Sequence, residues 1–151
     1  MGTISNNFSY REFEKSEVAE CKHITNVITT VAVRDSIKAL VDNVLQPLRE
    51  AREEPLTINS GYRCPKLNKE VGGVPTSQHV KGEAADVACS NPIELAQLAY
   101  DMGLPYDQMI IYPTFVHFSH KLEGEQRGQI LYNKAYRGEK LNYKIMNDIV
   151  A

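Results

Sequence analysis

At the centre of the chain lies the stretch SQHVKGEAADVAC, residues 77–89, in which a polar turn leads into small and β-branched residues. The part from Ala84 to Cys89 predicts a short interior strand. Gly82 allows the backbone to turn and Ala84 leaves room, so His79 and Asp86 can converge on one point at the mouth of a hairpin. An imidazole and a carboxylate that meet in this way are candidate metal ligands.

Another candidate ligand lies on a predicted hairpin further along the chain. Residues 108–112 and 115–119 predict two strands, and the short polar link between them favours antiparallel pairing. Strand alternation puts His117 on one face of the second strand and His120 on the other, so only one of them should join the site. Two imidazoles and a carboxylate make a three-ligand zinc site with a free fourth position, where zinc lowers the pKa of bound water to about 7.

Apolar spacing and turn residues predict the elements on either side of these segments. Apolar residues from Ile37 to Leu48 recur at steps of three and four, as on one buried helical face, and Pro47 is expected to kink this helix or end it early. A second helix is expected to begin at Asn91 and to end at Gly103. Shorter elements are expected as a helix near Tyr10, a strand at 56–59, a helix at 66–71 and a strand at 129–132.

The order of these elements predicts an α+β fold, a small single domain with helices packed on a mainly antiparallel sheet. The length of 151 residues fits one domain. A formal charge of −2, with no block of either sign, disfavours nucleic acid as a partner. No apolar run approaches the roughly 18 residues of a membrane span, and no signal peptide pattern opens the chain, so we expect a protein that is cytoplasmic as synthesised and does not insert into membranes.

Residues 77–86 match the pattern S-x-H-x-x-G-x-A-x-D, which resembles the signature of zinc D-alanyl-D-alanine carboxypeptidases and related phage endolysins. The likeness continues, in the expected order, through residues 45–50, 60–65, 68, 71–73, 106–108 and 115–119. It covers about residues 8–132 as a peptidase-like domain and leaves 133–151 as a polar tail that we expect to be loosely ordered. By this resemblance His79, Asp86 and His117 bind the zinc ion, and the fold is the small α+β domain shared with the hedgehog signalling fragment.

The resemblance also implies roles for residues near the three ligands. Arg63 matches an arginine that faces the substrate and the developing oxyanion in such enzymes, and a guanidinium supplies paired donors suited to that purpose. The plainer alternative for Arg63 is a surface salt bridge. Tyr62, in the same loop, is a candidate for substrate binding. Ser77 either orients the substrate or bonds the backbone of its own turn.

The general base is the role for which the sequence offers no clear residue. Members of the family place an acidic residue shortly before the last ligand, often three positions ahead, where this chain has Thr114. Asp107 is the nearest candidate for this catalytic role, and Glu83 is a second. Because a general base commonly contributes about 100-fold to 10,000-fold, its loss predicts a slow enzyme rather than necessarily an inert one.

The leading hypothesis is therefore a zinc metallopeptidase that hydrolyses peptide bonds in peptidoglycan stem peptides, as a carboxypeptidase or as an endopeptidase. A monomeric, phage-derived lysis protein that acts on the cell wall after release fits this hypothesis. The alternative is a catalytically weak zinc-containing domain that binds cell-wall peptide or a protein partner, with Thr114 at the base position as its main support. A structural domain without a metal is a third hypothesis.

Overall fold

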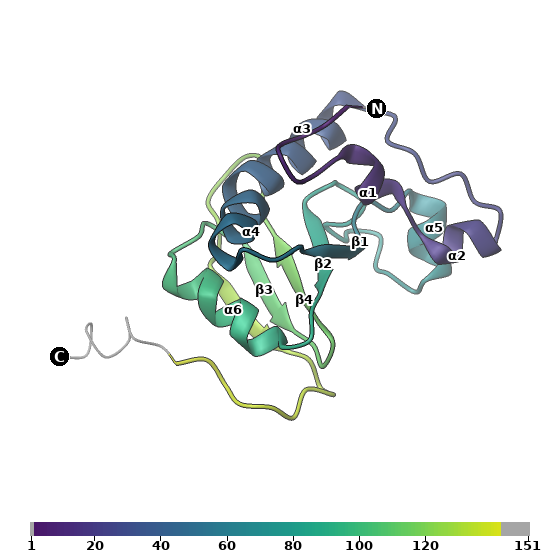
Figure 1. The fold of residues 1–151 in the computed structure, drawn as a ribbon. Helices are drawn as coiled ribbons and strands as arrows, with labels where there is room; N and C mark the ends of the chain where they lie inside the picture. Colours follow the sequence, from purple (N-terminus) through teal and green to yellow (C-terminus); the bar gives the residue numbers. More distant parts are fainter. Residues whose placement is uncertain (1, 143–151) are drawn as a thin grey trace.

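A single five-stranded sheet organises the molecule, and the computed structural model describes residues 2–142 (Figure 1). The strands are β1 (Thr57–Ser60), β2 (Ala84–Ala88), β3 (Gln108–Ile111), β4 (Phe115–Ser119) and β5 (Gln129–Tyr132). They lie in the order β1-β2-β4-β3-β5, and every neighbouring pair is antiparallel except β3 with β5, which is parallel. The predicted α+β class with a mainly antiparallel sheet is confirmed.

The helices form two groups around this sheet (Figure 1). The first group, which packs on the sheet, is α3 (Val31–Leu40), the π-helical turn η1 (Val41–Leu45), α4 (Gln46–Arg52) and α6 (Pro92–Asp101). The second group, near β1, is α1 (Tyr10–Glu14), α2 (Glu17–Cys21) and α5 (Pro65–Glu70). The short helix expected near Tyr10 is present, and the backbone N–H of Ser9 donates to the Glu12 side chain as the capping box requires.

The long helix continues past Pro47 to Arg52, and the expected break takes the form of a π-helical turn. A proline inside an α-helix lacks the amide donor and crowds the carbonyl four residues back. Here η1 ends just before α4, so Pro47 occupies the first turn of α4, where no amide donor is needed. The helix also begins earlier than the apolar spacing indicates, because the Thr30 side chain accepts a hydrogen bond from the backbone N–H of Val33.

Strand alternation gives the sheet a buried face and an open face. On the helix-covered face the side chains are fully buried, as for Val87 of β2, Val116 of β4 and Ile111 of β3. On the opposite face Asp86 and His117 are partly exposed, and they lie directly opposite each other on β2 and β4. The core therefore occupies one side of the sheet, and the other side presents polar groups.

The segment that follows β5 packs on the domain as far as the structure describes it. Leu141 is buried in the core, and the backbone of Asn142 exchanges two hydrogen bonds with the Gln97 side chain of α6. This part of the expected tail is thus held against the domain. Residues 143–151, for which loose order is also predicted, lie outside the described residues.

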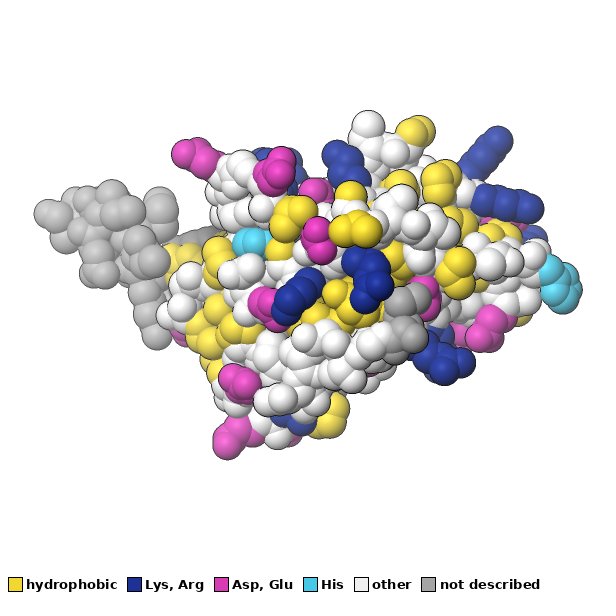
Figure 2. All heavy atoms as spheres, turned by 90° about the horizontal axis from the view of Figure 1, so that it is seen from above, with side chains coloured by type: hydrophobic (Ala, Val, Ile, Leu, Met, Phe, Trp, Pro, Cys, Tyr) yellow, Lys and Arg dark blue, Asp and Glu magenta, His cyan; other side chains and the backbone are white. Residues whose placement is uncertain are grey.

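The surface shows no sorting of charge by sign on the face that Figure 2 presents, where acidic and basic side chains are interspersed. This pattern agrees with the small formal charge of −2. Among residues 2–142, none of the helices is both long enough and apolar enough to cross a membrane.

Candidate metal centre

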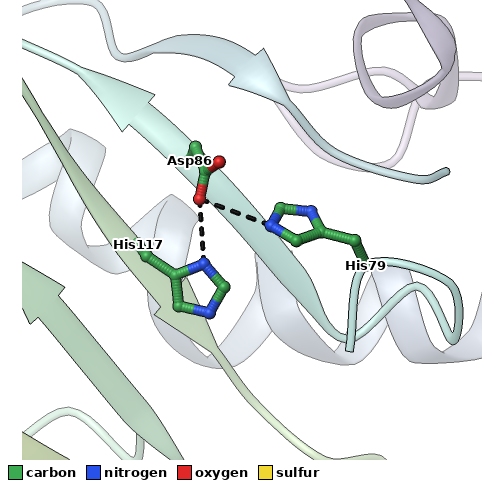
Figure 3. Close-up of side chains that lie close together, drawn as sticks. All are labelled: His79, Asp86 and His117. Carbon is green, nitrogen blue, oxygen red and sulfur yellow. Dashed lines mark hydrogen bonds and ion pairs between the residues drawn. The ribbon is translucent and has the colours of Figure 1, made fainter. Parts of the chain in front are cut away.

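Two imidazole side chains converge on one carboxylate oxygen of Asp86 on the open face of the sheet (Figure 3). Nδ1 of His117 lies 2.8 Å from Oδ1 of Asp86, and Nε2 of His79 lies 3.4 Å from the same oxygen. The two imidazole rings meet edge to face, with their centroids 5.1 Å apart. The three potential ligand atoms lie within 4.8 Å of one another, which is the proximity that ligands of a single metal ion need.

Strand pairing places two of these three side chains. Asp86 and His117 are partners in the antiparallel register of β2 and β4, so their side chains leave the sheet side by side on the same face. On its other side, His117 is paired with Ile110 of β3. His120 does not join the cluster, because it is buried with its Nδ1 2.6 Å from the carbonyl oxygen of Pro105. Of these two histidines, His117 lies in the cluster and His120 does not, and the role of His117 as a metal ligand stays a prediction.

His79 reaches the sheet from the turn that precedes β2. Its Nδ1 lies 2.7 Å from the carbonyl oxygen of Gly61, and its own carbonyl accepts a hydrogen bond from the backbone N–H of Arg63. Gly82 supports the turn with a φ of +77°, and a β-carbon at this position would lie 2.7 Å from the carbonyl oxygen of Val33. Glycine is needed here both for its backbone conformation and for the close approach of the neighbouring helix.

The donor atoms of the cluster fit a cation between the three side chains. A carbonyl oxygen can only accept, so Nδ1 of His79 carries a proton, and in the neutral ring the lone pair of Nε2 faces the Asp86 carboxylate. A lone pair and a carboxylate oxygen that face each other repel unless they share a cation. Two imidazoles with one carboxylate are a donor set of catalytic zinc sites, and the Gly61 carbonyl supplies the outer hydrogen bond that orients such a histidine.

The Asp86 carboxyl group is ionised at physiological pH. Burial by itself would raise its pKa, but when His117 and His79 are protonated their hydrogen bonds and positive charge outweigh burial and hold the pKa of Asp86 well below its usual range. Only 13% of the Asp86 side chain is exposed. A metal ion would therefore meet a carboxylate that is already deprotonated and already directed at both imidazoles.

Arg63 is held beside the cluster through each of its three side-chain nitrogen atoms. Nε lies 3.3 Å from Oγ of Ser60, Nη1 lies 3.3 Å from Oδ1 of Asn68, and Nη2 lies 3.9 Å from Oδ2 of Asp86. Asn68 is buried and is itself fixed by donating to the carbonyl oxygen of Val74. The guanidinium is therefore oriented from within the fold, unlike the arginine of an isolated surface salt bridge.

The cluster and Arg63 belong to one open pocket of about 420 Å³. The lining residues are Arg63, Val74, Thr76, Ser77, Gln78, His79, Asp86, Gln108, Ile110, Tyr112, His117 and Arg127. Within the part of the chain that the structure describes, Asp86 is the sole carboxylate of this lining. Arg63 and Arg127 carry guanidinium groups that only donate hydrogen bonds, so the pocket suits a ligand with acceptor or anionic groups.

The two residues predicted to bind substrate lie at different distances from the cluster. Ser77 lines the same pocket, but its Oγ accepts a hydrogen bond from the backbone N–H of His79, so the hydroxyl also shapes its own turn. Tyr62 is buried and lines an adjoining pocket, which shares Arg63 with the first. Both roles in substrate binding stay predictions, and Ser77 has the more direct position.

Asp107, the predicted general base, lies outside this lining, fully buried in a cluster of donors. Its carboxylate accepts hydrogen bonds from three nitrogen atoms of Arg127 and from Gln78, and Nζ of Lys121 lies 3.6 Å away. Burial would raise its pKa, but hydrogen bonds from Arg127 and Gln78 and the charge of Arg127 lower the pKa to about 2. A carboxylate held in this way accepts protons poorly at neutral pH. The geometry favours a structural role for Asp107 over the catalytic one.

Glu83, the second candidate base, also lies outside the lining, where its carboxylate accepts a hydrogen bond from Gln78.

Among the pocket residues that sequence reasoning did not single out, Tyr112 and Arg127 carry polar groups that can bind a substrate. Tyr112 follows β3 on the open face and stacks on Phe115, with ring centroids 4.1 Å apart. The sequence could have predicted its position, because strand alternation along 108–112 puts Gln108, Ile110 and Tyr112 on one face. Arg127 carries no comparable local signal, since it is placed by its contact with Asp107, 20 residues away along the chain.

Comparison with known proteins identifies the class of this chain. The family model described as Peptidase M15 matches residues 6–120, which is more than half of the chain, and the chain therefore belongs to this peptidase family. A curated protein that the chain resembles is the zinc D-Ala-D-Ala carboxypeptidase of Streptomyces albus G, with 34% identity over 86 residues. The match covers 55% of this chain and 34% of the relative, so the chain spans about one third of that protein's length. The family resemblance inferred from residues 77–86 is confirmed.

Proposed function

We propose that this chain is a zinc-dependent peptidase that hydrolyses the bond between two terminal D-alanine residues of peptidoglycan stem peptides. The observation that carries the proposal is the convergence of His79, Asp86 and His117 in a pocket that also contains the Arg63 guanidinium. Membership of the peptidase M15 family and the likeness to a zinc D-Ala-D-Ala carboxypeptidase support the choice of metal and of substrate.

The three side chains would hold zinc through Nε2 of His79, Nδ1 of His117 and the carboxylate of Asp86, the atoms that already face one another. Zinc in such a site supplies Lewis acidity and makes water acidic enough to provide a nucleophile near neutral pH. The pocket leaves one side of the cluster accessible to a peptide.

Arg63 orients the substrate and stabilises charge on it. Ser60 and Asn68 hold the guanidinium in place before a substrate arrives, so its donors need no rearrangement during the reaction. Donors organised in advance stabilise the negative charge that develops on the peptide carbonyl oxygen as the carbonyl carbon becomes tetrahedral. This is the role that the sequence resemblance implies for Arg63.

Tyr112 supplies an uncharged donor in the same pocket. Burial and the charge of Asp86 raise the pKa of its phenol, against the opposing effect of Arg63, so the hydroxyl keeps its proton at neutral pH. Thr114, at the position where family members carry an acidic residue, is exposed and lies outside the pocket lining. We therefore assign to Tyr112 a hydrogen bond to the substrate that contributes to catalysis.

The variant Tyr112→Phe is expected to lower kcat about tenfold to 100-fold, because a hydrogen bond to a charged group contributes about 1.5–3 kcal/mol. Phenylalanine keeps the ring that stacks on Phe115, so zinc content and melting temperature should stay near those of the unmodified protein. Steady-state kinetics with a peptide ending in D-Ala-D-Ala would measure the effect. Tyr136→Phe is the matched control, since it removes a hydroxyl outside the pocket lining. An unchanged kcat for Tyr112→Phe would remove Tyr112 from the mechanism.

The proposal is tested by adding purified protein to a peptide that ends in D-Ala-D-Ala and measuring the release of D-alanine before and after chelation. We expect release with zinc present, loss of release on chelation, and recovery when zinc is returned. Chelation should also lower the melting temperature, because a metal present at about 100 times its Kd stabilises the folded state by about 2.7 kcal/mol. A protein that neither binds zinc nor changes its melting temperature would instead be the metal-free structural domain.

A zinc-containing binding domain is the second candidate function. It is favoured by the pocket lining, which among the described residues has no carboxylate besides the candidate ligand Asp86. Loss of a general base lowers the rate of hydrolysis by about 100-fold to 10,000-fold. Such a protein would bind wall peptides and hydrolyse them very slowly. Tight binding of zinc and peptide without release of D-alanine would select this function.

The alternative to carboxypeptidase activity is an endopeptidase that is made in the cytoplasm and acts on the cell wall after release, in the setting of a phage lysis protein. The resemblance of residues 77–86 to phage endolysins supports this setting. Suspensions of purified cell walls provide the test. An endopeptidase that cuts cross-links would clear the suspension, whereas a carboxypeptidase would release D-alanine and leave the turbidity unchanged.

A further inference from the structure

A second arginine, Arg127, lines the pocket together with the candidate ligands and Arg63. Its side chain is 48% exposed, and it lies on the segment between β4 and β5. It also lies beyond residues 6–120, the part of the chain that the family model matches. Neither the binding of zinc nor the stabilisation of an oxyanion accounts for a second guanidinium at this place.

A buried carboxylate fixes the direction of the Arg127 guanidinium. Nη2 and Nε donate to Oδ2 of Asp107 at 2.7 and 3.1 Å, and the backbone N–H of Arg127 donates to Oδ1 at 2.8 Å. Asp107 is fully buried, and Gln78, another residue of the pocket lining, also donates to it. Asp107 thus acts as a positioning residue that ties Arg127 to the pocket wall through several hydrogen bonds at once.

The anchor engages Nε and Nη2 of the Arg127 guanidinium. Lys121 also faces the Asp107 carboxylate, with its Nζ 3.6 Å from Oδ1. Among residues 2–142, no hydrogen bond engages Nη1 of Arg127, which leaves donors for a ligand. A guanidinium with free donors beside a partly enclosed pocket is suited to a carboxylate.

The two arginines approach the cluster from opposite edges of the sheet. Arg63 follows β1, and Arg127 precedes β5, while the cluster lies on β2 and β4 between those edge strands. A peptide that crosses the cluster therefore has one guanidinium on each side. With Arg63 at the carbonyl that is attacked, Arg127 is placed for a negatively charged group further along the same peptide.

We propose that Arg127 binds the free C-terminal carboxylate of the substrate and so makes this chain a carboxypeptidase rather than an endopeptidase. The inference rests on the proposed peptidase function, since it concerns the same pocket. An endopeptidase substrate has a peptide bond in place of that carboxylate, which offers Arg127 no charge. Binding of the charged end then favours the terminal residue over an internal one.

The test uses two peptides whose scissile amide is replaced by a –CH₂–NH– group, so that the zinc-loaded protein cannot cleave them. One ends in a free carboxylate and the other in a carboxamide, and they are otherwise identical. Isothermal titration would give Kd for each with the unmodified protein, Arg127→Gln and Lys121→Gln. Lys121→Gln is the matched control, because it removes the other cation of Asp107 from a position outside the pocket lining.

We expect the unmodified protein and Lys121→Gln to bind the free acid about 10-fold to 100-fold more tightly than the carboxamide, as a charge-assisted hydrogen-bonded pair predicts. Arg127→Gln should bind the two peptides equally, with its affinity for the carboxamide unchanged. If Arg127→Gln fails to fold, Arg127→Lys keeps a cation for Asp107 and should bind the free acid more weakly than the unmodified protein does. An equal preference for the free acid in all folded variants would overturn the inference.

Hydrolysis of the natural peptide, measured in parallel, separates this inference from the proposed function. Suppose that the protein prefers the free acid, that this preference depends on Arg127, and that no D-alanine is released. This result would contradict the peptidase proposal and would still support the carboxylate site at Arg127. Release of D-alanine at equal rates by the unmodified protein and Arg127→Gln would support the peptidase and contradict the carboxylate site.

Discussion

Replacing His117 by alanine is expected to lower D-alanine release by at least about 1,000-fold, because a catalytic metal contributes several kcal/mol and each 1.36 kcal/mol is a factor of ten in rate. The substitution removes one of three candidate ligands and leaves Asp86 with a single imidazole partner. Zinc content, measured by atomic absorption after dialysis, should fall from near one ion per chain to a small fraction.

The control for this variant is His120→Gln. His120 is three residues along the chain, is buried, and lies outside the cluster, with its Nδ1 against the Pro105 carbonyl. Glutamine keeps a donor for that carbonyl, so zinc content and turnover should be retained. A His117→Ala protein that still holds one zinc ion per chain and still releases D-alanine would refute both the ligand assignment and the proposed function.

The variant Arg63→Lys is expected to lower kcat about 100-fold to 1,000-fold, the usual cost of removing one donor from an oxyanion site. Lysine keeps the positive charge but not the planar fork, so it cannot contact Ser60, Asn68 and the substrate at the same time. Zinc content should stay unchanged, because Arg63 is not a ligand. Steady-state kinetics and zinc analysis on the same preparation would show both results.

Arg11→Lys is a suitable control for this second variant, since Arg11 is an exposed residue of α1 outside the pocket. Kinetics equal to those of the unmodified protein are expected for it. Should Arg63→Lys retain full kcat and raise only KM, Arg63 would bind the ground state and the transition state equally, and its assigned part in charge stabilisation would be wrong.

Local sequence rules predicted most of the elements that carry the site. The two strands that became β3 and β4 were found from their alternation and short link, and the start of α1 from the Ser9–Glu12 capping box. These rules work because they depend on residues a few positions apart. Pro47 shows their limit, since the chain accommodates it in the first turn of α4, directly after a π-helical turn whose apolar side chains pack in the core.

The pocket was predicted less completely than the ligands. His79, Asp86 and His117 stand in a motif that identifies them by residue type and spacing, and the structure brings all three together. The general base was sought at Asp107 because it is near in sequence to His117. Its burial beside Arg127 depends on how the segment before β5 folds back onto the sheet, which spacing does not reveal.

The amino-acid sequence by itself determined the types of the elements, the face on which His117 stands and the identity of the three candidate ligands, because helical periodicity, strand alternation and residue chemistry are local properties. Only the tertiary structure decided the strand order β1-β2-β4-β3-β5, the hydrogen bond from His79 to Gly61, and the placement of Arg127 by Asp107. Those contacts join segments far apart in the chain, and their geometry follows from the packing of the whole core.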